Sequence, residues 1–166
     1  MKKRIAALGI VLSLTAVGAA FSGEDEKVAA RMQPSDEPYV PGLGDLMGAI
    51  QVRHAKLWFA GAARNWPLAA YELHEIEEGF EDAARHHPLH RGKPIADLID
   101  SLTKQPIADL QRAVTQRNAA RFEPAFDALS QACNACHQEN GYGFIAIQRP
   151  TAPPVTNQDF AAPGGR

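Results

Sequence analysis

The sequence predicts an all-α protein, a four-helix antiparallel bundle, and three observations lead to this fold class. Apolar residues recur at spacings of three and four along four successive segments, as on the buried face of a helix. Short connections join the segments, which favours antiparallel neighbours. The alternation expected of strands is nearly absent, apart from a brief run at residues 144–147.

The first 20 residues have the features of an export signal. Lys2, Lys3 and Arg4 precede an apolar run over residues 5–20, which ends in small residues before the acidic stretch GEDE. We expect cleavage near Ala20, a periplasmic location and no membrane span in the mature chain. The alternative is an uncleaved anchor helix, but this run is shorter than the ~20 residues that a bilayer requires.

The charge balance gives no indication of nucleic-acid binding. The pI is near 6.3, and without residues 1–20 the chain has 14 basic against 19 acidic residues, a net charge of −5. Residues 21–42 mix charges with three prolines, which predicts a flexible leader.

The first predicted helix begins at Leu43 and has about 20 residues. Its apolar face carries Leu46, Met47, Ile50, His54, Leu57, Trp58 and Gly61. It should end near residues 65–66, because Pro67 disfavours a helical residue ahead of it.

Pro67 suits the first turn of a second helix, which should end in the segment HHPLHRGKP. The apolar face of this helix carries Leu73, Ile76, Phe80, Ala83 and Ala84. A short repeat follows, PIADLIDSL from Pro94 and PIADLQRAV from Pro106. Because each proline suits a helix start, we expect a third helical region that is broken or kinked near Gln105.

The fourth helix has a continuous stripe on one face, with Pro124 in its first turn and Gly141 as its terminator. The stripe carries Phe122, Phe126, Leu129, Cys133, Cys136 and His137. Residues 43–140 would therefore form the helical domain. Residues 141–166, with three prolines between positions 150 and 154, are predicted to form an extended proline-rich tail.

Both cysteines of the chain lie in the segment CNACH, residues 133–137. C-x-x-C-H is the pattern for covalent attachment of haem c, in which two thiols bond the vinyl groups and the histidine binds the iron. On a helix, Cys133 and Cys136 lie nearly one turn apart, and His137 projects from the same side. Phe126 and Leu129 would pack against the porphyrin.

Three other uses of the cysteine pair fit less well. A thioredoxin-type pair opens a helix within a βαβ unit, whereas this pair closes the last helix of an all-α chain. A disulfide across two intervening residues would close a very small loop and contribute little stability. A zinc site needs about four ligands, and a second thiol pair is missing.

A haem-attachment motif at the end of the last of four helices resembles the class II c-type cytochromes, which include cytochrome c′ and its low-spin relatives. The likeness covers roughly residues 43–140. The segment IQVRHAKLWFAG and the proline-rich C-terminal tail mark a distinct subgroup of monohaem cytochromes. The resemblance implies a four-helix bundle with one covalent haem c, tethered by Cys133 and Cys136 and ligated by His137. The class often dimerises through its first two helices, which leaves a homodimer open, and it usually ends soon after the motif.

The second axial ligand decides the function. In an antiparallel bundle the end of the fourth helix lies beside the start of the first, and the resemblance also implies a distal ligand there. Met47 lies about one turn into that helix, and its thioether opposite His137 would give a low-spin iron with a raised potential. His54 is the alternative, about 10 Å further along the axis, and an open or water-bound site is the third. Without a role at the haem, Met47 would be core filler and His54 a buried, hydrogen-bonded histidine.

Other polar residues have weaker indications. The candidates to bind a haem propionate are Arg53, Lys56 and Arg64. A loop with three histidines is predicted to be solvated rather than metal-binding, because it lacks acidic or thiol neighbours at fixed spacing: His86, His87 and His90. The six carboxylates of residues 72–82 would form a solvated face or a docking patch for a basic redox partner.

These observations predict a periplasmic electron carrier without enzyme activity, whose partners are periplasmic or membrane-bound redox proteins and the cytochrome maturation machinery. The alternative is a cytochrome c′-like, five-coordinate haem protein that binds or senses NO or CO beside Met47 and Ile50. A peroxidase would need a distal acid–base pair, for which His54 is the single candidate. Residues 144–147 would either cover the haem edge and exclude water or belong to a disordered end.

Overall fold

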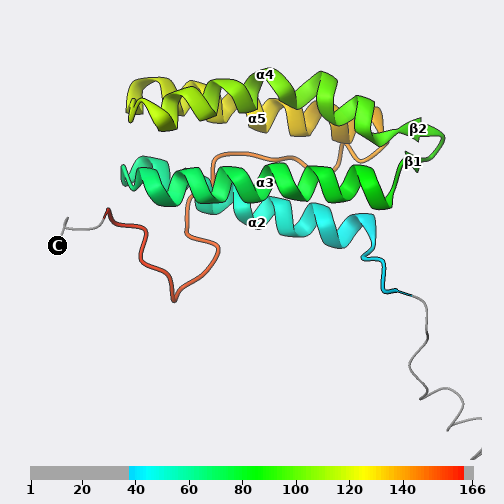
Figure 1. The fold of residues 1–166 in the computed structure, drawn as a ribbon, viewed down its shortest axis with the longest axis horizontal. Helices are drawn as coiled ribbons and strands as arrows, with labels where there is room; N and C mark the ends of the chain where they lie inside the picture. The colour runs from blue at the N-terminus through cyan, green and yellow to red at the C-terminus, as the bar shows by residue number, and fades with distance from the viewer. Residues whose placement is uncertain (1–37, 163–166) are drawn as a thin grey trace, which may run out of the picture. The chain divides into compact units, whose positions relative to one another are not determined.

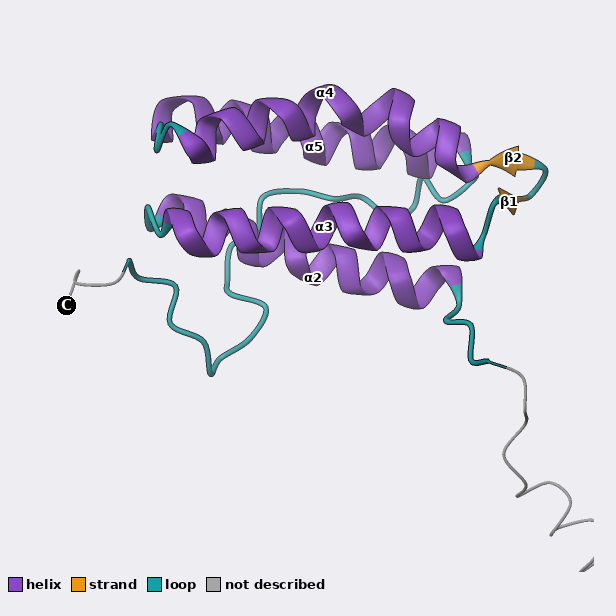
Figure 2. Ribbon diagram, in the orientation of Figure 1, coloured by secondary structure: helices purple, strands orange, loops and turns teal. Residues whose placement is uncertain are grey.

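The computed structural model describes residues 38–162, in which four helices and a small two-stranded sheet follow one another. The helices are α2 (Leu43–Ala62), α3 (Trp66–His86), α4 (Ile95–Thr115) and α5 (Ala119–Glu139). Figure 1 shows them side by side, with the connections alternating between the two ends of the bundle, and Figure 2 shows how little of this unit is strand. The predicted four-helix architecture is confirmed. The export signal (residues 1–20) and nearly all of the leader (residues 21–42) lie outside the described residues.

The same three-residue connection joins α2 to α3 and α4 to α5. In each, an arginine adopts a left-handed conformation, Arg64 with φ 58° and Arg117 with φ 52°, and an asparagine follows. The N–H groups of Asn65 and Asn118 each donate a 2.8 Å bond to the carbonyl five residues back, which closes the preceding helix. Their side chains then accept a bond from the first turn of the next helix. Because these connections are so short, the joined helices must run antiparallel.

Two predictions about proline differ from the structure. Of the break or kink expected near Gln105, the break is absent, because α4 is one continuous helix that contains Pro106. A proline removes one helical hydrogen bond, but Ile107 and Leu110 beyond it are buried in the core, which favours continuing the helix. Pro124 lies in the second turn of α5 rather than the first, because Asn118 caps the helix at an earlier residue.

A hairpin that the sequence analysis missed connects α3 to α4. Strands β1 (Leu89–His90) and β2 (Lys93–Pro94) pair antiparallel. Arg91 and Gly92 form the two-residue turn, and both have positive φ, 51° and 77°, as a type I′ turn requires. The weak strand signal at residues 144–147 corresponds to no strand.

Buried side chains fill the bundle near the α2–α3 and α4–α5 connections, with aromatic rings at their centre. Phe122 and Phe126 on α5 are almost fully buried and contact the ring of Trp58 on α2. Gly61 of α2 lies directly against the Phe122 ring, so that a Cβ atom there would overlap it. No helix within residues 38–162 is long and apolar enough to cross a membrane.

Gly61→Ala is therefore expected to destabilise the fold by about 2–3 kcal/mol, because the added methyl group overpacks the Phe122 ring. Urea unfolding of the variant measures this cost. In the Phe122→Leu background the smaller side chain leaves room for the methyl group, so the cost should shrink. An equal cost in both backgrounds would contradict the proposed contact.

Candidate functional site

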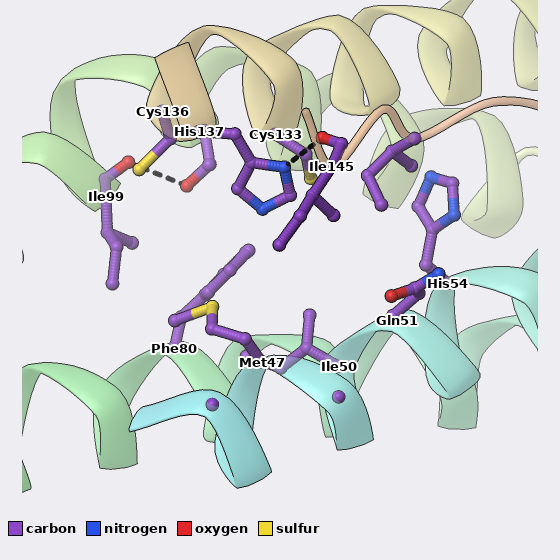
Figure 3. Close-up of a pocket in the computed structure, with 14 residues that line it drawn as sticks. Met47, Ile50, Gln51, His54, Phe80, Ile99, Cys133, Cys136, His137 and Ile145 are labelled. Atoms are coloured by element: carbon purple, nitrogen blue, oxygen red, sulfur yellow. Dashed lines mark hydrogen bonds between the residues drawn. The ribbon is translucent and has the colours of Figure 1, made fainter. Parts of the chain in front are cut away.

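A cavity of about 210 Å³ lies between α2, α5 and the chain that follows α5 (Figure 3). A second cavity of about 190 Å³ adjoins it and shares Met47, Cys136 and His137 with it. Together they reach the size of cofactor pockets, which begin at roughly 300 Å³. The apolar walls come from several elements: Ile50, Phe80, Ile99, Ile145 and Ile147.

All five predicted site residues line this cavity: Met47, His54, Cys133, Cys136 and His137. The antiparallel arrangement explains why, since it places the last two turns of α5 beside the first turns of α2. Figure 3 shows Met47 on the opposite wall from His137. The sequence therefore identified the residues that meet, although they lie far apart in the chain.

The imidazole of His137 is held by the chain that follows its own helix. Its Nδ1 lies 2.7 Å from the carbonyl oxygen of Ile145. A carbonyl can only accept, so Nδ1 carries a proton, and in the neutral ring the lone pair is on Nε2. In Figure 3 the second ring nitrogen faces into the cavity. The side chain is therefore oriented as a donor to an electrophile or a metal inside the cavity.

The end of α5 fixes where that chain turns. Gly141 has φ 76°. The Gly141 N–H donates to the Gln138 carbonyl (3.1 Å), and the Tyr142 N–H donates to the His137 carbonyl (2.7 Å). This pair of bonds forms a Schellman motif. The predicted terminator is thus confirmed.

The two cysteines are free thiols. Burial, with a smaller contribution from neighbouring Cys136, raises the pKa of Cys133 to about 12. Burial also raises the pKa of Cys136, and the Asn140 amide opposes part of this effect. Both thiols are therefore protonated at neutral pH, unlike the thiolate that a redox-active or nucleophilic cysteine requires.

His54 and Met47, the two possible second ligands, differ in their contacts with other side chains. The Nε2 of His54 lies 2.9 Å from Ser130 Oγ, and the Ser130 hydroxyl donates to the carbonyl of Phe126 (3.0 Å). The Ser130 oxygen can therefore only accept from His54, whose Nε2 carries the proton. Its ring also lies 4.2 Å from that of Phe126, and burial lowers the pKa of His54 to about 4. Met47 lines both cavities, and its thioether is the less engaged of the two possible ligands.

Some expected neighbours lie elsewhere. Phe126 and Leu129 do not line the cavity but belong to the aromatic core, because α5 turns that part of its face toward α2 and α4. Gln51 also lines the cavity. Sequence reasoning missed the wall residue Ile99 of α4, since apolar periodicity does not distinguish a core from a cavity wall. Ile145 and Ile147 of the tail line the cavity, as the first of the two alternatives for residues 144–147 expects.

The arginines and the acidic run have structural roles that the sequence did not indicate. Glu72 is only 1 % exposed and accepts a hydrogen bond from Arg53 (3.2 Å), which also pairs with Glu75 (2.8 Å). Lys56 lies 4.0 Å from the same Glu72 carboxylate. Arg53 and Lys56 therefore form ion pairs that link α2 to α3, and Glu72 does not belong to a solvated face.

The histidine loop is bonded to backbone and to tyrosine. His87 Nε2 lies 2.9 Å from the carbonyl oxygen of Pro41, and His90 Nε2 lies 3.0 Å from the Tyr142 hydroxyl. Within the described part of the chain, no group of three or more His, Cys, Asp or Glu residues is placed to hold a metal ion.

Burial of His54 predicts a pH dependence of stability. Its pKa of about 4 in the folded protein lies below the ordinary value of 6.5, so below pH ~6.5 the unfolded chain takes up a proton that the folded protein excludes. The free energy of unfolding is therefore highest above pH ~6.5. It falls by about 3 kcal/mol as pH decreases from ~6.5 through ~4. His54→Gln should remove this part of the pH dependence in urea unfolding. The exposed His74→Gln control should keep the wild-type slope, and an identical slope in His54→Gln would contradict the assignment.

Comparison of the chain with protein-family models, with characterised proteins and with solved structures gives no match.

Proposed function

We propose that this chain is an exported, periplasmic monohaem c-type cytochrome of the class II kind, which carries single electrons between redox proteins. One observation carries the proposal. Two free thiols and a histidine whose Nδ1 is bonded to a carbonyl, in the spacing C-x-x-C-H, line one apolar cavity.

The wall opposite the cysteines fits a flat group. Gly44 and Gly48 of α2 both line the cavity, and a Cβ atom built on either would have no heavy atom within 4 Å. A glycine inside a helix costs about 1 kcal/mol relative to alanine, so two of them one turn apart need a reason. The close approach of a porphyrin face to the helix backbone supplies one.

In this proposal, each residue has a defined task. Cys133 and Cys136 would hold the haem through thioethers, each formed by adding S–H across a vinyl group with no net oxidation. His137, through Nε2, and Met47, through its sulfur, would bind the iron. A bound haem supplies a one-electron iron couple, whose potential this ligand pair raises. Buried Ile50 and the half-buried Ile99 and Ile147 would shield the haem from water, and the helical frame would keep the ligands in place.

The alternative is a five-coordinate haem protein that binds NO or CO. It is favoured by one feature of the cavity, the apolar side chains of Ile50 and Phe80 beside Met47. If the Met47 side chain did not ligate the iron, these residues would surround a site of suitable polarity for a diatomic gas. A peroxidase is less well supported, because His54 donates to Ser130 and its pKa is far below the usual range.

For the carrier, we propose partners that are basic redox proteins in the periplasm or at its membrane. After Glu72 is discounted, α3 still offers the exposed carboxylates Glu78 and Glu81. The other three have partners within the protein, since Glu75 pairs with Arg53, Glu77 accepts from Gln111 and Asp82 pairs with Arg85. Cytochrome maturation machinery would attach the haem, and a homodimer through the first two helices follows from the resemblance alone.

The test is a set of visible spectra on protein exported by a host that matures c-type cytochromes. Wild type should carry covalent haem, show low-spin bands when reduced and not bind carbon monoxide. Met47→Ala should open the site, bind carbon monoxide and lower the midpoint potential by on the order of 0.1 V. His54→Ala is the control and should stay low-spin.

Other outcomes discriminate between the proposals. Rapid binding of carbon monoxide by high-spin, ferrous wild type would favour the gas-binding protein. Loss of the low-spin state in His54→Ala but not in Met47→Ala would show that His54, not Met47, is the second ligand. Colourless protein with two titratable thiols would exclude any haem function.

A further inference from the structure

The chain after α5 forms a strap, residues 144–149, that runs back along this helix (Figure 1). Every second strap residue is attached to α5, through Ile145, Ile147 and Arg149. Extended backbone rises about 3.3 Å per residue against 1.5 Å in a helix. A strap of this kind can therefore meet successive turns of α5 on one face, and two of its side chains, Ile145 and Ile147, line the cavity.

Asn134 makes the central attachment. Its Nδ2 donates to the Ile147 carbonyl (2.8 Å), and its Oδ1 accepts from the Ile147 N–H (2.6 Å). The amide thereby binds both polar groups of one strap residue, as a neighbouring strand would. Asn134 is also one of the two residues between the cysteines, so this attachment arises inside the haem-attachment motif itself.

A second attachment lies further along the strap. The guanidinium of Arg149 bonds both carboxylate oxygens of Asp127 (2.6 and 2.7 Å) and lies 4.5 Å from the Trp58 ring. This pair is solvent-exposed, and such pairs typically contribute less than about 1 kcal/mol. The Asn134 clamp is half-buried and lies two residues from Ile145. It holds Ile145 from the far side, whereas on the side of α5 the Ile145 N–H donates to the Tyr142 carbonyl (2.8 Å).

The position of Ile145 matters because its carbonyl orients His137. The bond from His137 Nδ1 to the Ile145 oxygen fixes the tautomer and the ring orientation. The clamp on Ile147 is two residues further along the strap. Moving Ile147 would shift the Ile145 carbonyl and weaken its bond to the imidazole.

We infer that Asn134 is a positioning residue for the axial imidazole, which acts through the strap and the Ile145 carbonyl. The spacer between the two cysteines thus determines how His137 presents Nε2 to the cavity. The inference rests on the proposed haem function, because its consequence concerns the iron ligand.

The test compares Asn134→Ala with wild type in the reduced, haem-loaded protein, by NMR of the exchange of the His137 Nδ1 proton with solvent deuterium. Gln131→Ala is the matched control, since it removes an exposed amide from the same helix. We expect exchange at least about tenfold faster in Asn134→Ala and unchanged in the control. Backbone amides of the core, such as that of Leu57, should keep their wild-type rates, which a general loss of stability would not allow.

A second variant covers the case in which Asn134→Ala does not fold. Asn134→Asp keeps an acceptor for the Ile147 N–H but loses the donor to the Ile147 carbonyl, so an intermediate exchange rate is expected. Wild-type exchange of the Nδ1 proton in a folded, haem-loaded variant would overturn the inference while leaving the proposed function intact. Failure of wild type to bind haem would instead overturn the function, and the visible spectrum distinguishes the two results.

Discussion

The two three-residue connections, with Arg64–Asn65 and Arg117–Asn118 at their centres, constrain the rest of this structure. Each closes one helix and caps the next within the same few residues, so the paired helices have no freedom to run other than antiparallel. As a result, the first turns of α2 lie beside the last turns of α5. Met47 and His137 come to face one another across a cavity because of where the helices begin and end, not because of any direct bond between them.

The interior of the bundle has two parts, a packed core at one end and a cavity at the other. Near the helix connections, the rings of Trp58, Phe122 and Phe126 pack against each other, and Gly61 allows α2 to approach them closely. At the other end, α2 carries Gly44 and Gly48 where larger residues would be expected, and the cavity lies there. The His54–Ser130 bond lies between the two regions. A rigid core beside an open, apolar cavity is an arrangement that suits a cofactor whose surroundings must not relax when its charge changes.

The sequence predicted the helices and the meeting of the site residues, because periodicity and the C-x-x-C-H spacing are local signals. It failed where a long-range contact outweighs a local preference. Pro106 is tolerated inside α4 because the residues beyond it are buried, and Glu72 is buried because Arg53 of another helix pairs with it. Apolar periodicity could not predict how the strap is attached to α5, because side chain-to-backbone bonds such as those of Asn134 leave no repeating pattern in the sequence. The sequence does mark the Arg91–Gly92 turn with a glycine, which adopts positive φ easily. The strands on either side have two residues each, which is too short to show alternation.

The protonation states of the site disfavour acid–base and thiol chemistry and are compatible with the electron carrier proposed above. Burial raises the pKa of both thiols and lowers that of His54, so each of these groups is neutral at physiological pH. None can act as a ready nucleophile, and His54 is a poor base because its proton affinity is low and its Nε2 is already bonded to Ser130. His137 differs in that its Nδ1 donates to the Ile145 carbonyl, which directs Nε2 into the cavity. If the proposed haem is bound there, its iron would lie among neutral side chains and could change oxidation state without these groups taking up a proton.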